Sequence, residues 1–490
     1  MYKPSLNEAK KIADMKKFKV IPISCELYSD LCTPIEVLKK LRKISSNCYL
    51  LESNEDIKNR GRYTFLGFNP TLELTCINGN TQIRNGSVKN YTTENPDYYI
   101  KQILNDYRSP KLDYLPSFTG GLVGYFSYDY IKYSEPSLRL QPKDDENFKD
   151  VDLMLFDKVI AFDNLRHKII LMVNVSTEEI EMTYQKAIEE LEKLKLMIRE
   201  GASIDEEPPV LLSSIKALFS KEKYCEMVES AKEHIRQGDI FQVVLSNRFE
   251  AKMQGSLLNV YRVIRTINPA PYMFFFSSDD IEMAGASPET LVKLENRVVS
   301  TFPLAGTRPR GKNAEEDLIM QKELLTDEKE LAEHNMLVDL GRNDIGKISK
   351  FGTVKVDKYM EIEKFSHVMH IGSAVVGEIS TDKDAVDAVN AVLPAGTLSG
   401  APKIRACEII NQLEDNKRGI YGGAIGYLAL NGDLDTCIAI RLAFKKNGKV
   451  FIRSGAGIVA DSIPEREYEE CLNKAKAIIE ALEISKERLE

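Results

Sequence analysis

The sequence has no tryptophan, and only five of its 490 residues are histidine. It also lacks any apolar run that approaches the roughly 18 residues a membrane-spanning helix requires. Its 74 acidic and 66 basic residues are mixed along the chain and leave a net charge of −8. Nucleic-acid-binding proteins instead concentrate positive charge in one patch or segment. We therefore expect neither a membrane nor a nucleic acid as a partner.

The eight cysteines form no C-x-x-C pair and lie scattered along the chain. This spacing favours reduced thiols over a disulfide framework or a zinc site. The N-terminal stretch "MYKPSLNEAKKIADMKKFKV" contains no apolar segment of the kind that a secretory signal requires. Both observations predict a cytoplasmic protein.

The length of 490 residues indicates two or three domains. The acidic segment "GASIDEEPPVLLSS", which contains two adjacent prolines, is typical of a linker. It divides the chain into an N-terminal domain at residues 18–205 and a second domain at residues 215–483. The first domain contains mostly short strands and then a helix, which we expect to open with a capping box formed by Ser176 and Glu179.

The second domain contains clusters of short strands separated by long helices. Apolar periodicity predicts a helix that ends near Gly238, a long helix over residues 314–342, and a last helix that begins at Pro464. Strict βαβ alternation is absent from the whole chain. This pattern predicts an α+β fold in which extensive antiparallel sheets are flanked by helices.

Gln242 is conspicuous because it interrupts the apolar stretch "GDIFQVVLSNRF". Most of this stretch, including Phe241, is expected to form a buried strand. A buried amide costs about 1–3 kcal/mol unless it finds hydrogen-bond partners. Alternation along a strand places Gln242 on the same face as Ile240, Val244 and Ser246.

Two glycine-rich segments resemble nucleotide-binding loops. "GTRPRGKN", from Gly306 to Asn313, nearly matches the P-loop pattern, but Asn313 occupies the hydroxyl position and Pro309 interrupts the loop. "GAGIVA", from Gly455 to Ala460, fits the loose dinucleotide pattern, which requires a helix that opens at the glycines. A nicotinamide-dependent oxidoreductase is therefore the alternative from a different class of protein.

Several carboxylates could bind a metal or simply face solvent. Glu333 lies in a charged helical segment, while Glu467 and Glu470 lie opposite the apolar stripe of the last helix. Periodicity alone favours a solvated face, although Mg²⁺ takes oxygen ligands of this kind. His367 and His370 lie close together, and a histidine pair of this kind is more often structural than metal-binding.

Residues 218 to 483 contain a series of motifs that together resemble one enzyme family. In order, they are "GDIFQVVLSNR", "NPAPYM", "GASPETLV", "PLAGTRPRG", "AEHNMLVDLGRND", "SHVMH", "LPAGTLSGAPKIRA", "RGIYGGAIGYL", "CIAIRLA" and "IRSGAGIVADSIPEREYEECLNKA". By these motifs the chain resembles the chorismate-utilising enzymes, which include anthranilate, aminodeoxychorismate, isochorismate and salicylate synthases. The N-terminal segments "LLES" and "GRYTFLG" resemble the anthranilate-forming members. The resemblance implies two extensive antiparallel sheets flanked by helices, with the active-site cleft between them.

The resemblance also implies a set of site residues. Glu289 would be the general acid that protonates the departing C4 hydroxyl of chorismate, which requires a carboxyl that stays neutral near pH 7. Glu333 and Glu470 would bind Mg²⁺, and Glu467 would act through water. His370 would help to expel pyruvate. The implied substrate contacts are Gly306, Thr307, Thr397, Tyr421, Arg441, Gly455, Ala456 and Gly457.

Gln242 and Ala305 distinguish this chain from other members of the family that it resembles. Members that add water at C2 have a lysine in place of Gln242, and a lysine can act as the base that activates water. Aminodeoxychorismate synthases have a nucleophilic lysine in place of Ala305. The two residues therefore imply direct attack of ammonia on C2, followed by loss of pyruvate to give anthranilate. An enzyme that stops at aminodeoxyisochorismate is the nearer alternative.

The resemblance further implies two partners besides chorismate. The chain has no G-x-C-x-G nucleophile turn of an amidotransferase, so glutamine-derived ammonia would come from a separate glutamine amidotransferase subunit. "LLES" and "NPAPYM" match the feedback site for L-tryptophan, an inhibitor. The implied tryptophan-binding residues are Ser53, Pro271, Tyr272 and Met273. Plain core packing is the competing interpretation of these residues.

Overall fold

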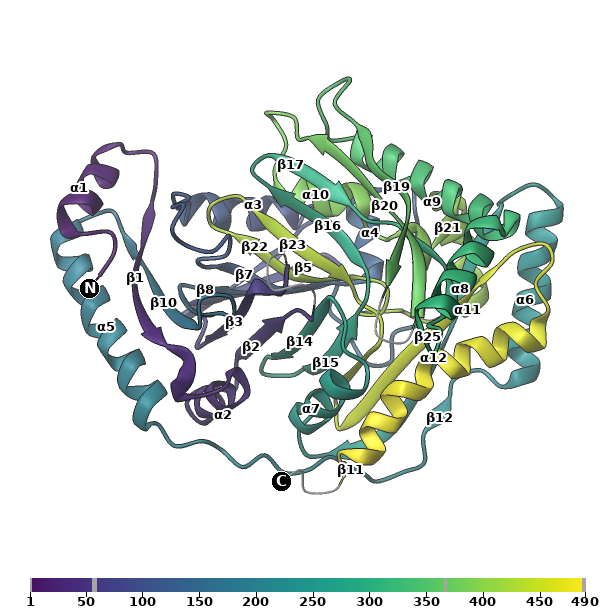
Figure 1. The fold of residues 1–490 in the computed structure, drawn as a ribbon, viewed down its shortest axis with the longest axis horizontal. Helices are drawn as coiled ribbons and strands as arrows, with labels where there is room; N and C mark the ends of the chain where they lie inside the picture. The colour runs from purple at the N-terminus through teal and green to yellow at the C-terminus, as the bar shows by residue number, and fades with distance from the viewer. Residues whose placement is uncertain (1, 55–59, 365–367, 487–490) are drawn as a thin grey trace.

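Two large antiparallel sheets form the centre of the molecule, and helices pack against them (Figure 1). The structure is a computed structural model that describes residues 2–54, 60–364 and 368–486. The observed architecture confirms the predicted α+β fold with extensive antiparallel sheets flanked by helices.

The first sheet contains 13 strands among the described residues. In their order across the sheet they are β1 (Val20–Tyr28), β10 (Lys168–Ser176), β9 (Lys158–Asp163), β3 (Tyr63–Phe68), β2 (Cys48–Glu52), β14 (Tyr272–Ser277), β15 (Glu282–Ser287), β24 (Leu442–Lys446), β25 (Lys449–Ile458), β13 (Gln242–Gln254) and β11 (Val210–Leu211), with β12 (Lys216–Ala217) and β21 (Gly400–Ala401) paired to β13.

The second sheet contains 12 strands among the described residues. Across the sheet they are β18 (Leu304–Pro309), β20 (Val368–Glu378), β17 (Val298–Thr301), β16 (Thr290–Glu295), β23 (Leu434–Ile438), β22 (Ala424–Ala429), β7 (Gly121–Phe126), β8 (Val151–Phe156), β4 (Leu72–Ile77), β5 (Asn80–Asn85) and β6 (Ser87–Thr92), with β19 (Lys355–Lys364) paired to β20.

Helices cover the outer faces of both sheets. Those on the first sheet are α1 (Leu6–Asp14), α2 (Pro34–Ile44), α5 (Ile180–Glu200), α6 (Lys221–Arg236), α7 (Leu258–Ile267), α11 (Lys403–Glu414) and α12 (Pro464–Ile484). Those on the second are α3 (Asp97–Asp106), α9 (Glu328–Gly346) and α10 (Ala385–Val392). The remaining helical segments are α4 (Ile131–Ser134), α8 (Ala314–Thr326), η1 (Ser29–Leu31), η2 (Arg60–Arg62), η3 (Tyr128–Tyr130) and η4 (Gly396–Leu398).

Aromatic side chains from both sheets fill the space between them. Phe65 of β3 meets Phe118 edge-on with ring centroids 5.5 Å apart, and Phe118 meets Tyr427 of β22 at 4.3 Å. Such pairs contribute about 0.5–1.5 kcal/mol beyond the apolar area that they bury. The two sheets therefore share one aromatic core.

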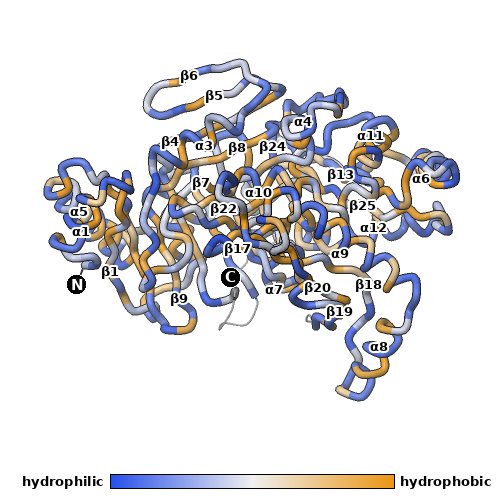
Figure 2. Tube along the Cα trace, turned by 90° about the horizontal axis from the view of Figure 1, so that it is seen from above, coloured by the Kyte–Doolittle hydropathy of each residue, from blue (hydrophilic) through white to orange (hydrophobic). Residues whose placement is uncertain are grey.

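Hydrophilic residues dominate the β5–β6 hairpin, which projects from the molecule in Figure 2.

Both sheets contain strands from both halves of the sequence. In the first sheet β2 pairs with β14, so that Glu52 lies opposite Met273. In the second sheet β7 pairs with β22, so that Phe126 lies opposite Ala424. The linker itself contributes β11, and β12 follows just after it; both strands pair with β13. The division at residues 205–215 stays a prediction, and the two segments that it separates are joined through both sheets.

Some local predictions are wrong for identifiable reasons. Ser176 is the last residue of β10, and Glu179 precedes α5 in a left-handed conformation, so they form no capping box. The long helix expected over 314–342 is two helices, because the side chain of Asp327 accepts hydrogen bonds from the backbone of Lys329 and Glu330 and starts α9. The last helix begins at Pro464 as predicted.

The stretch around Gln242 is only partly the buried strand that its apolar residues predict. Gln237 is the C-cap of α6, and Gly238 follows it at a φ of +80°. Strand β13 begins at Gln242 itself, and the preceding Phe241 is 72% exposed. Gln242 is nevertheless buried, as expected.

Candidate active site

Glu289 lies in the short connection between β15 and β16, with its side chain buried. Thr397 of η4 donates a hydrogen bond to Oε1 of Glu289 at 3.1 Å. Burial raises the pKa of Glu289 to about 8, although the bond from Thr397 and the charge of Arg441 oppose the shift. Because burial favours the uncharged form of a carboxyl, Glu289 holds its proton at neutral pH. It therefore has the protonation state that a general acid needs.

Arg441 lies in the tight connection between β23 and β24. Its backbone is held at a φ of +51°, in the left-handed region that residues other than glycine rarely adopt. The carbonyl of Arg441 accepts a hydrogen bond from the backbone N–H of Ala286 at 3.1 Å, which ties the turn to β15. Burial lowers the pKa of Arg441, while the charge of Glu289 raises it. The guanidinium remains a cation, and its fork can bind a carboxylate.

His370 lies in β20 and faces β18. Its Nδ1 lies 2.8 Å from the backbone carbonyl of Gly306 and 3.2 Å from the hydroxyl of Thr307. Because a carbonyl only accepts hydrogen bonds, Nδ1 carries the proton and Nε2 is the basic atom. Burial is the main cause that lowers the pKa of His370, so the imidazole is neutral at pH 7. The structure thus brings together His370, Gly306 and Thr307, three of the predicted site residues.

Gln242 is held between α9 and β25. Its Nε2 donates to Oε1 of Glu333 at 3.3 Å. A Cβ atom added at Gly457 would lie 2.7 Å from the same nitrogen, so the amide occupies the space that a side chain at Gly457 would need. The amide oxygen has no hydrogen-bond partner among the described residues. A buried polar atom without a partner is a feature of sites that receive a ligand.

Tyr421 and Lys474 lie against the glycine segment of β25. A Cβ atom added at Gly455 would lie 3.1 Å from the hydroxyl of Tyr421. Lys474 of α12 donates to the carbonyl of Gly455 at 3.1 Å and forms an ion pair with Glu470 at 2.7 Å. Gly455, Ala456 and Gly457 therefore connect the surroundings of Gln242 and Glu333 with those of Glu470.

Carboxylates of α9 and α12 are the predicted ligands for Mg²⁺. The described residues contain no cluster of three or more His, Cys, Asp or Glu side chains suited to a metal ion. Burial and the charge of Glu470 both raise the pKa of Glu467, as expected for carboxylates without enough compensating charge. Mg²⁺ commonly uses one or two carboxylates and completes its shell with water and substrate. Glu333 and Glu470 stay a predicted ligand pair of that kind; here Glu333 accepts a hydrogen bond from Gln242, and Glu470 forms an ion pair with Lys474.

A cavity of about 500 Å³ lies beside these residues. His370, Arg441 and Glu470 line it together with the cations Arg466 and Lys474. Glu289 and Thr397 instead line a separate small cavity of about 30 Å³. The larger cavity has room and positive charge for a small anionic ligand.

The four residues expected to bind an inhibitor also lie together. Ser53, Pro271, Tyr272 and Met273 all line a cavity of about 850 Å³ between the N-terminal strands and β14. The hydroxyl of Tyr272 donates to Asp435 at 2.8 Å and lies 2.9 Å from the hydroxyl of Thr290, the neighbour of Glu289 in sequence. Pro271 also lines the 500 Å³ cavity, so the two cavities share one wall residue.

Neither glycine-rich segment forms a nucleotide loop. The carboxylate of Asp317 accepts from the backbone N–H of Gly311 at 2.7 Å and pairs with Arg310, so it fills the position that a phosphate would take. Gly455 and Gly457 lie inside the antiparallel strand β25 rather than at the start of a helix. The structural basis for a nicotinamide site is therefore missing from this segment. His367 lies outside the described residues.

Sequence reasoning missed two groups of residues near the cavity. The sequence assigns no role to Lys474, yet Lys474 contacts both Gly455 and Glu470. Glu414, Arg418 and Arg453 are almost fully buried behind β13 and had no predicted role. In the sequence, only the i,i+4 separation of Glu414 and Arg418 indicates that these residues contact one another.

Comparison with known proteins places the chain in a family. The model of the chorismate binding enzyme family matches residues 46–480, so the chain belongs to that family. It is 47% identical to anthranilate synthase component 1 of Acetivibrio thermocellus and 42% identical to that of Aquifex aeolicus, with 99% of each chain covered in both cases. These full-length similarities confirm the resemblance that the motifs indicate.

Solved structures give the same result for the fold. Anthranilate synthase component I from Streptococcus pneumoniae aligns with a TM-score of 0.74 at 37% identity, over 92% of this chain and 98% of that one. The menaquinone-specific isochorismate synthase from Escherichia coli aligns with a TM-score of 0.70 at 17% identity, over 98% and 100%, which shows the shared fold alone. Among the described residues, no helix has the length and apolar character to cross a membrane.

Proposed function

We propose that the chain is the synthase subunit of an anthranilate synthase, which converts chorismate and ammonia to anthranilate and pyruvate. The observation that carries the proposal is the pairing of a protonated acid, Glu289, with an amide, Gln242, where a base would be needed to activate water. Ala305 supports it, because this buried residue of β18 offers no nucleophile opposite Ile371, the neighbour of His370.

The first step adds ammonia to the ring. The lone pair of ammonia forms a bond to C2, the two ring double bonds shift, and the C4–O bond breaks. Glu289 gives its proton to the C4 oxygen, which leaves as water, since hydroxide is a poor leaving group. Gln242 accepts a hydrogen bond from ammonia through its amide oxygen and needs no change of protonation state.

The second step removes pyruvate from aminodeoxyisochorismate. A proton leaves C2, the C3–O bond breaks, and the ring becomes aromatic as enolpyruvate departs. We assign the proton transfer to His370, whose neutral Nε2 is basic because Gly306 holds the proton on Nδ1. Free enolpyruvate then tautomerises to pyruvate.

The remaining wall residues bind and orient chorismate in this proposal. Arg441, which lines the 500 Å³ cavity, binds the enolpyruvyl carboxylate through its fork. The other predicted substrate contacts, which we call the substrate wall, are Thr307, Thr397, Tyr421 and the Gly455–Gly457 backbone. Mg²⁺ held by Glu333 and Glu470, with Glu467 acting through water, would neutralise the ring carboxylate of the substrate.

A partner and an inhibitor complete the proposal. Ammonia would come from a separate glutamine amidotransferase subunit, component II of the enzyme, as the component 1 names of the relatives suggest. L-Tryptophan would bind in the 850 Å³ cavity. Its lining supports an amphipathic amino acid, because acidic, basic and aromatic side chains occur together there: Glu52, Asp435, Arg62, Arg166, Tyr63, Phe65 and Tyr427.

One assay tests the reaction. Purified chain with chorismate, ammonium and Mg²⁺ should release fluorescent anthranilate and an equal amount of pyruvate, and EDTA should stop both. Formation of isochorismate or aminodeoxychorismate would contradict the roles of Gln242 and Ala305. Aminodeoxyisochorismate without pyruvate would identify an enzyme that stops after the first step.

A further inference from the structure

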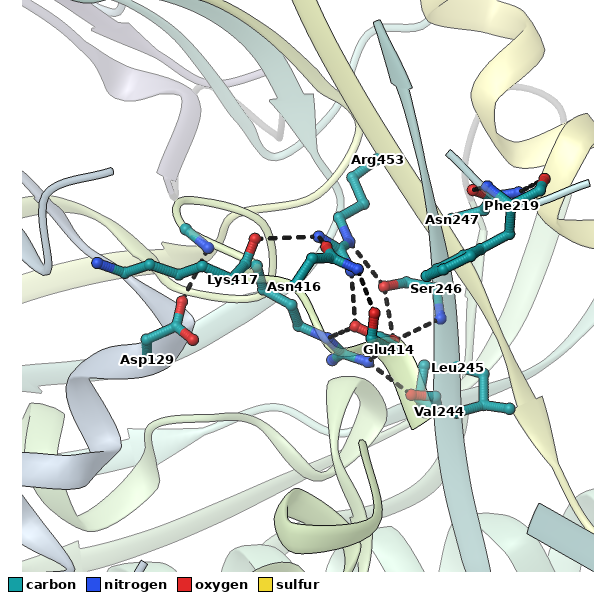
Figure 3. A network of polar contacts seen from close by, with 12 residues as sticks. Asp129, Phe219, Val244, Leu245, Ser246, Asn247, Glu414, Asn416, Lys417 and Arg453 are labelled. Atoms are coloured by element: carbon teal, nitrogen blue, oxygen red, sulfur yellow. Dashed lines mark hydrogen bonds and ion pairs between the residues drawn. The ribbon is translucent and has the colours of Figure 1, made fainter. Parts of the chain in front are cut away.

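Glu414, Arg418 and Arg453 form a buried ion cluster behind the predicted substrate wall, and we call these three residues the Glu414 cluster. Glu414 binds Arg418 through both oxygens, at 2.6 and 2.9 Å, and binds Arg453 at 2.6 Å. Its Oε1 also accepts from the backbone N–H and the hydroxyl of Ser246, at 2.8 and 2.9 Å. Figure 3 shows Glu414, Arg453 and Ser246 converging beside β13. All four side chains are at most 4% exposed.

The cluster binds backbone groups as well as charges. Arg418 donates to the carbonyl of Leu398 at 2.6 Å and to that of Val244 at 2.7 Å. Arg453 donates to the side chain of Asn416 at 2.6 Å and to the carbonyl of Lys417 at 3.2 Å. These bonds join η4, β13, β25 and the turn after α11 at one point. An arginine suits this task because its planar fork offers several donors in fixed directions.

Each of these segments continues directly into a predicted site residue. Val244 is two residues from Gln242, and Leu398 is next to Thr397, which binds Glu289. Arg453 is two residues from Gly455, and Arg418 is three residues from Tyr421. The cluster therefore contacts every strand or turn that supplies one of these residues.

We propose that the Glu414 cluster is a positioning assembly for the reaction, which aligns Gln242, Thr397 and the Gly455 segment with respect to one another. The inference rests on the proposed function. One carboxylate faces two guanidiniums, so the cluster also has a net charge of +1 behind a wall that binds a substrate with two carboxylates. An ion cluster with a purely structural role would stabilise the fold, but its bonds would not be concentrated on the segments of this wall.

The test replaces the guanidinium fork of Arg418 by an ammonium group, which keeps the positive charge. Arg418→Lys removes the parallel bonds to Glu414 and the backbone carbonyls, so kcat for ammonia-dependent anthranilate formation should fall about 10- to 100-fold through misalignment. The KM for chorismate should stay within a factor of about three, because the charge is retained. Arg42→Lys is the matched control. Arg42 also forms a buried ion pair, with Glu282 at 2.9 Å and 13% exposure, but it contacts none of the wall segments.

The outcome is read on folded protein, checked by circular dichroism and thermal melting. Similar loss of melting temperature in both variants, with loss of kcat only in Arg418→Lys, supports the proposal. Full kcat in folded Arg418→Lys, or an equal loss in Arg42→Lys, overturns it. If Arg418→Lys does not fold, Ser246→Ala serves instead, because it removes hydroxyl bonds to Glu414 and Arg453 but keeps the backbone bond. Unchanged kcat in Ser246→Ala would then refute the role of the cluster.

The two proposals fail in different ways. A wild-type chain that forms no anthranilate would refute the proposed reaction. An active wild type together with fully active cluster variants would refute only the positioning role.

Discussion

The 500 Å³ cavity beside His370 and the 850 Å³ cavity beside Ser53 differ in the charge state and the pairing of their ionisable side chains. Burial lowers the pKa values of His370 and Arg441, which line the first cavity, and raises that of Glu289, which lines the small cavity of about 30 Å³. Near the second, charges are paired: Glu52 forms a two-bond ion pair with Arg265, at 2.8 and 3.0 Å. Pro271 lines both cavities.

The difference indicates what each cavity can do. Strongly shifted pKa values concentrate at sites that transfer protons, because such sites need groups in unusual protonation states. The second cavity is lined by charged side chains and aromatic rings that can recognise a ligand, and burial raises the pKa values of its Tyr427 and Cys437, so both stay uncharged at neutral pH. In the proposed function the first cavity is catalytic and the second is regulatory.

The largest expected effect comes from removing the buried acid. Glu289→Gln keeps the size and the hydrogen-bonding capacity of the side chain but has no proton to give. We expect kcat to fall about 10²- to 10⁴-fold, as is typical for loss of a general acid. Steady-state anthranilate fluorescence measures the change. A loss of less than about threefold would show that Glu289 is not the acid and would remove the main contrast between the cavities.

The pH profile sharpens the same prediction. Because the pKa of Glu289 is raised to about 8, its acid form is present below that pH, and activity should fall as pH rises through about 8. The profile of kcat/KM for chorismate must be measured with free ammonia held constant, so that titration of ammonium is not mistaken for titration of the enzyme. The residual activity of Glu289→Gln should lack this descent.

The next effect concerns the choice of nucleophile. Gln242→Lys places beside Glu333 an amine that in its neutral form can act as a base toward water, and removes the amide oxygen that would accept from ammonia. We expect ammonia-dependent turnover to fall about 10-fold or more, with isochorismate appearing as a product of water attack. Chromatographic product analysis distinguishes the two products. An unchanged ammonia rate would show that Gln242 does not contact the nucleophile.

A smaller effect is expected in the regulatory cavity. Ser53→Ala should weaken inhibition by tryptophan about 10-fold, the equivalent of one lost hydrogen bond, without lowering ammonia-dependent turnover in its absence. Met273→Thr should act in the same direction through lost apolar contact. Inhibition curves measure both. If the wild-type chain ignores millimolar tryptophan, the assignment of this cavity is wrong.

The smallest effect tests a residue outside both cavities. Asn313 accepts hydrogen bonds from the backbone of Glu315 and Glu316 and so caps α8. Asn313→Ala should lower the free energy of unfolding by about 1 kcal/mol, measured from urea denaturation, and leave KM for chorismate unchanged. A large rise in KM would show that the loop before α8 contributes to ligand binding.

Much of the site could be predicted from the sequence because its motifs are specific. The motifs place Gln242, Thr397, His370 and Gly457 in one predicted site, and the structure shows Gln242 beside Gly457, Thr397 bonded to Glu289, and His370 in the wall of the 500 Å³ cavity. The break at Asp327 was missed because a cap and helix interior have similar local periodicity. The exposure of Phe241 was missed because apolarity predicts burial only on average.

The sequence by itself determined the family, the fold class and the residue types at the site, since these depend on motifs and apolar periodicity. Only the tertiary structure decided that Glu289 is protonated, that Gln242 contacts Glu333, and that Glu414 faces two arginines. The physical reason is that protonation depends on burial and on neighbouring charges. Those neighbours lie far apart in the chain. Gln242 and Glu333, for example, are more than 90 residues apart.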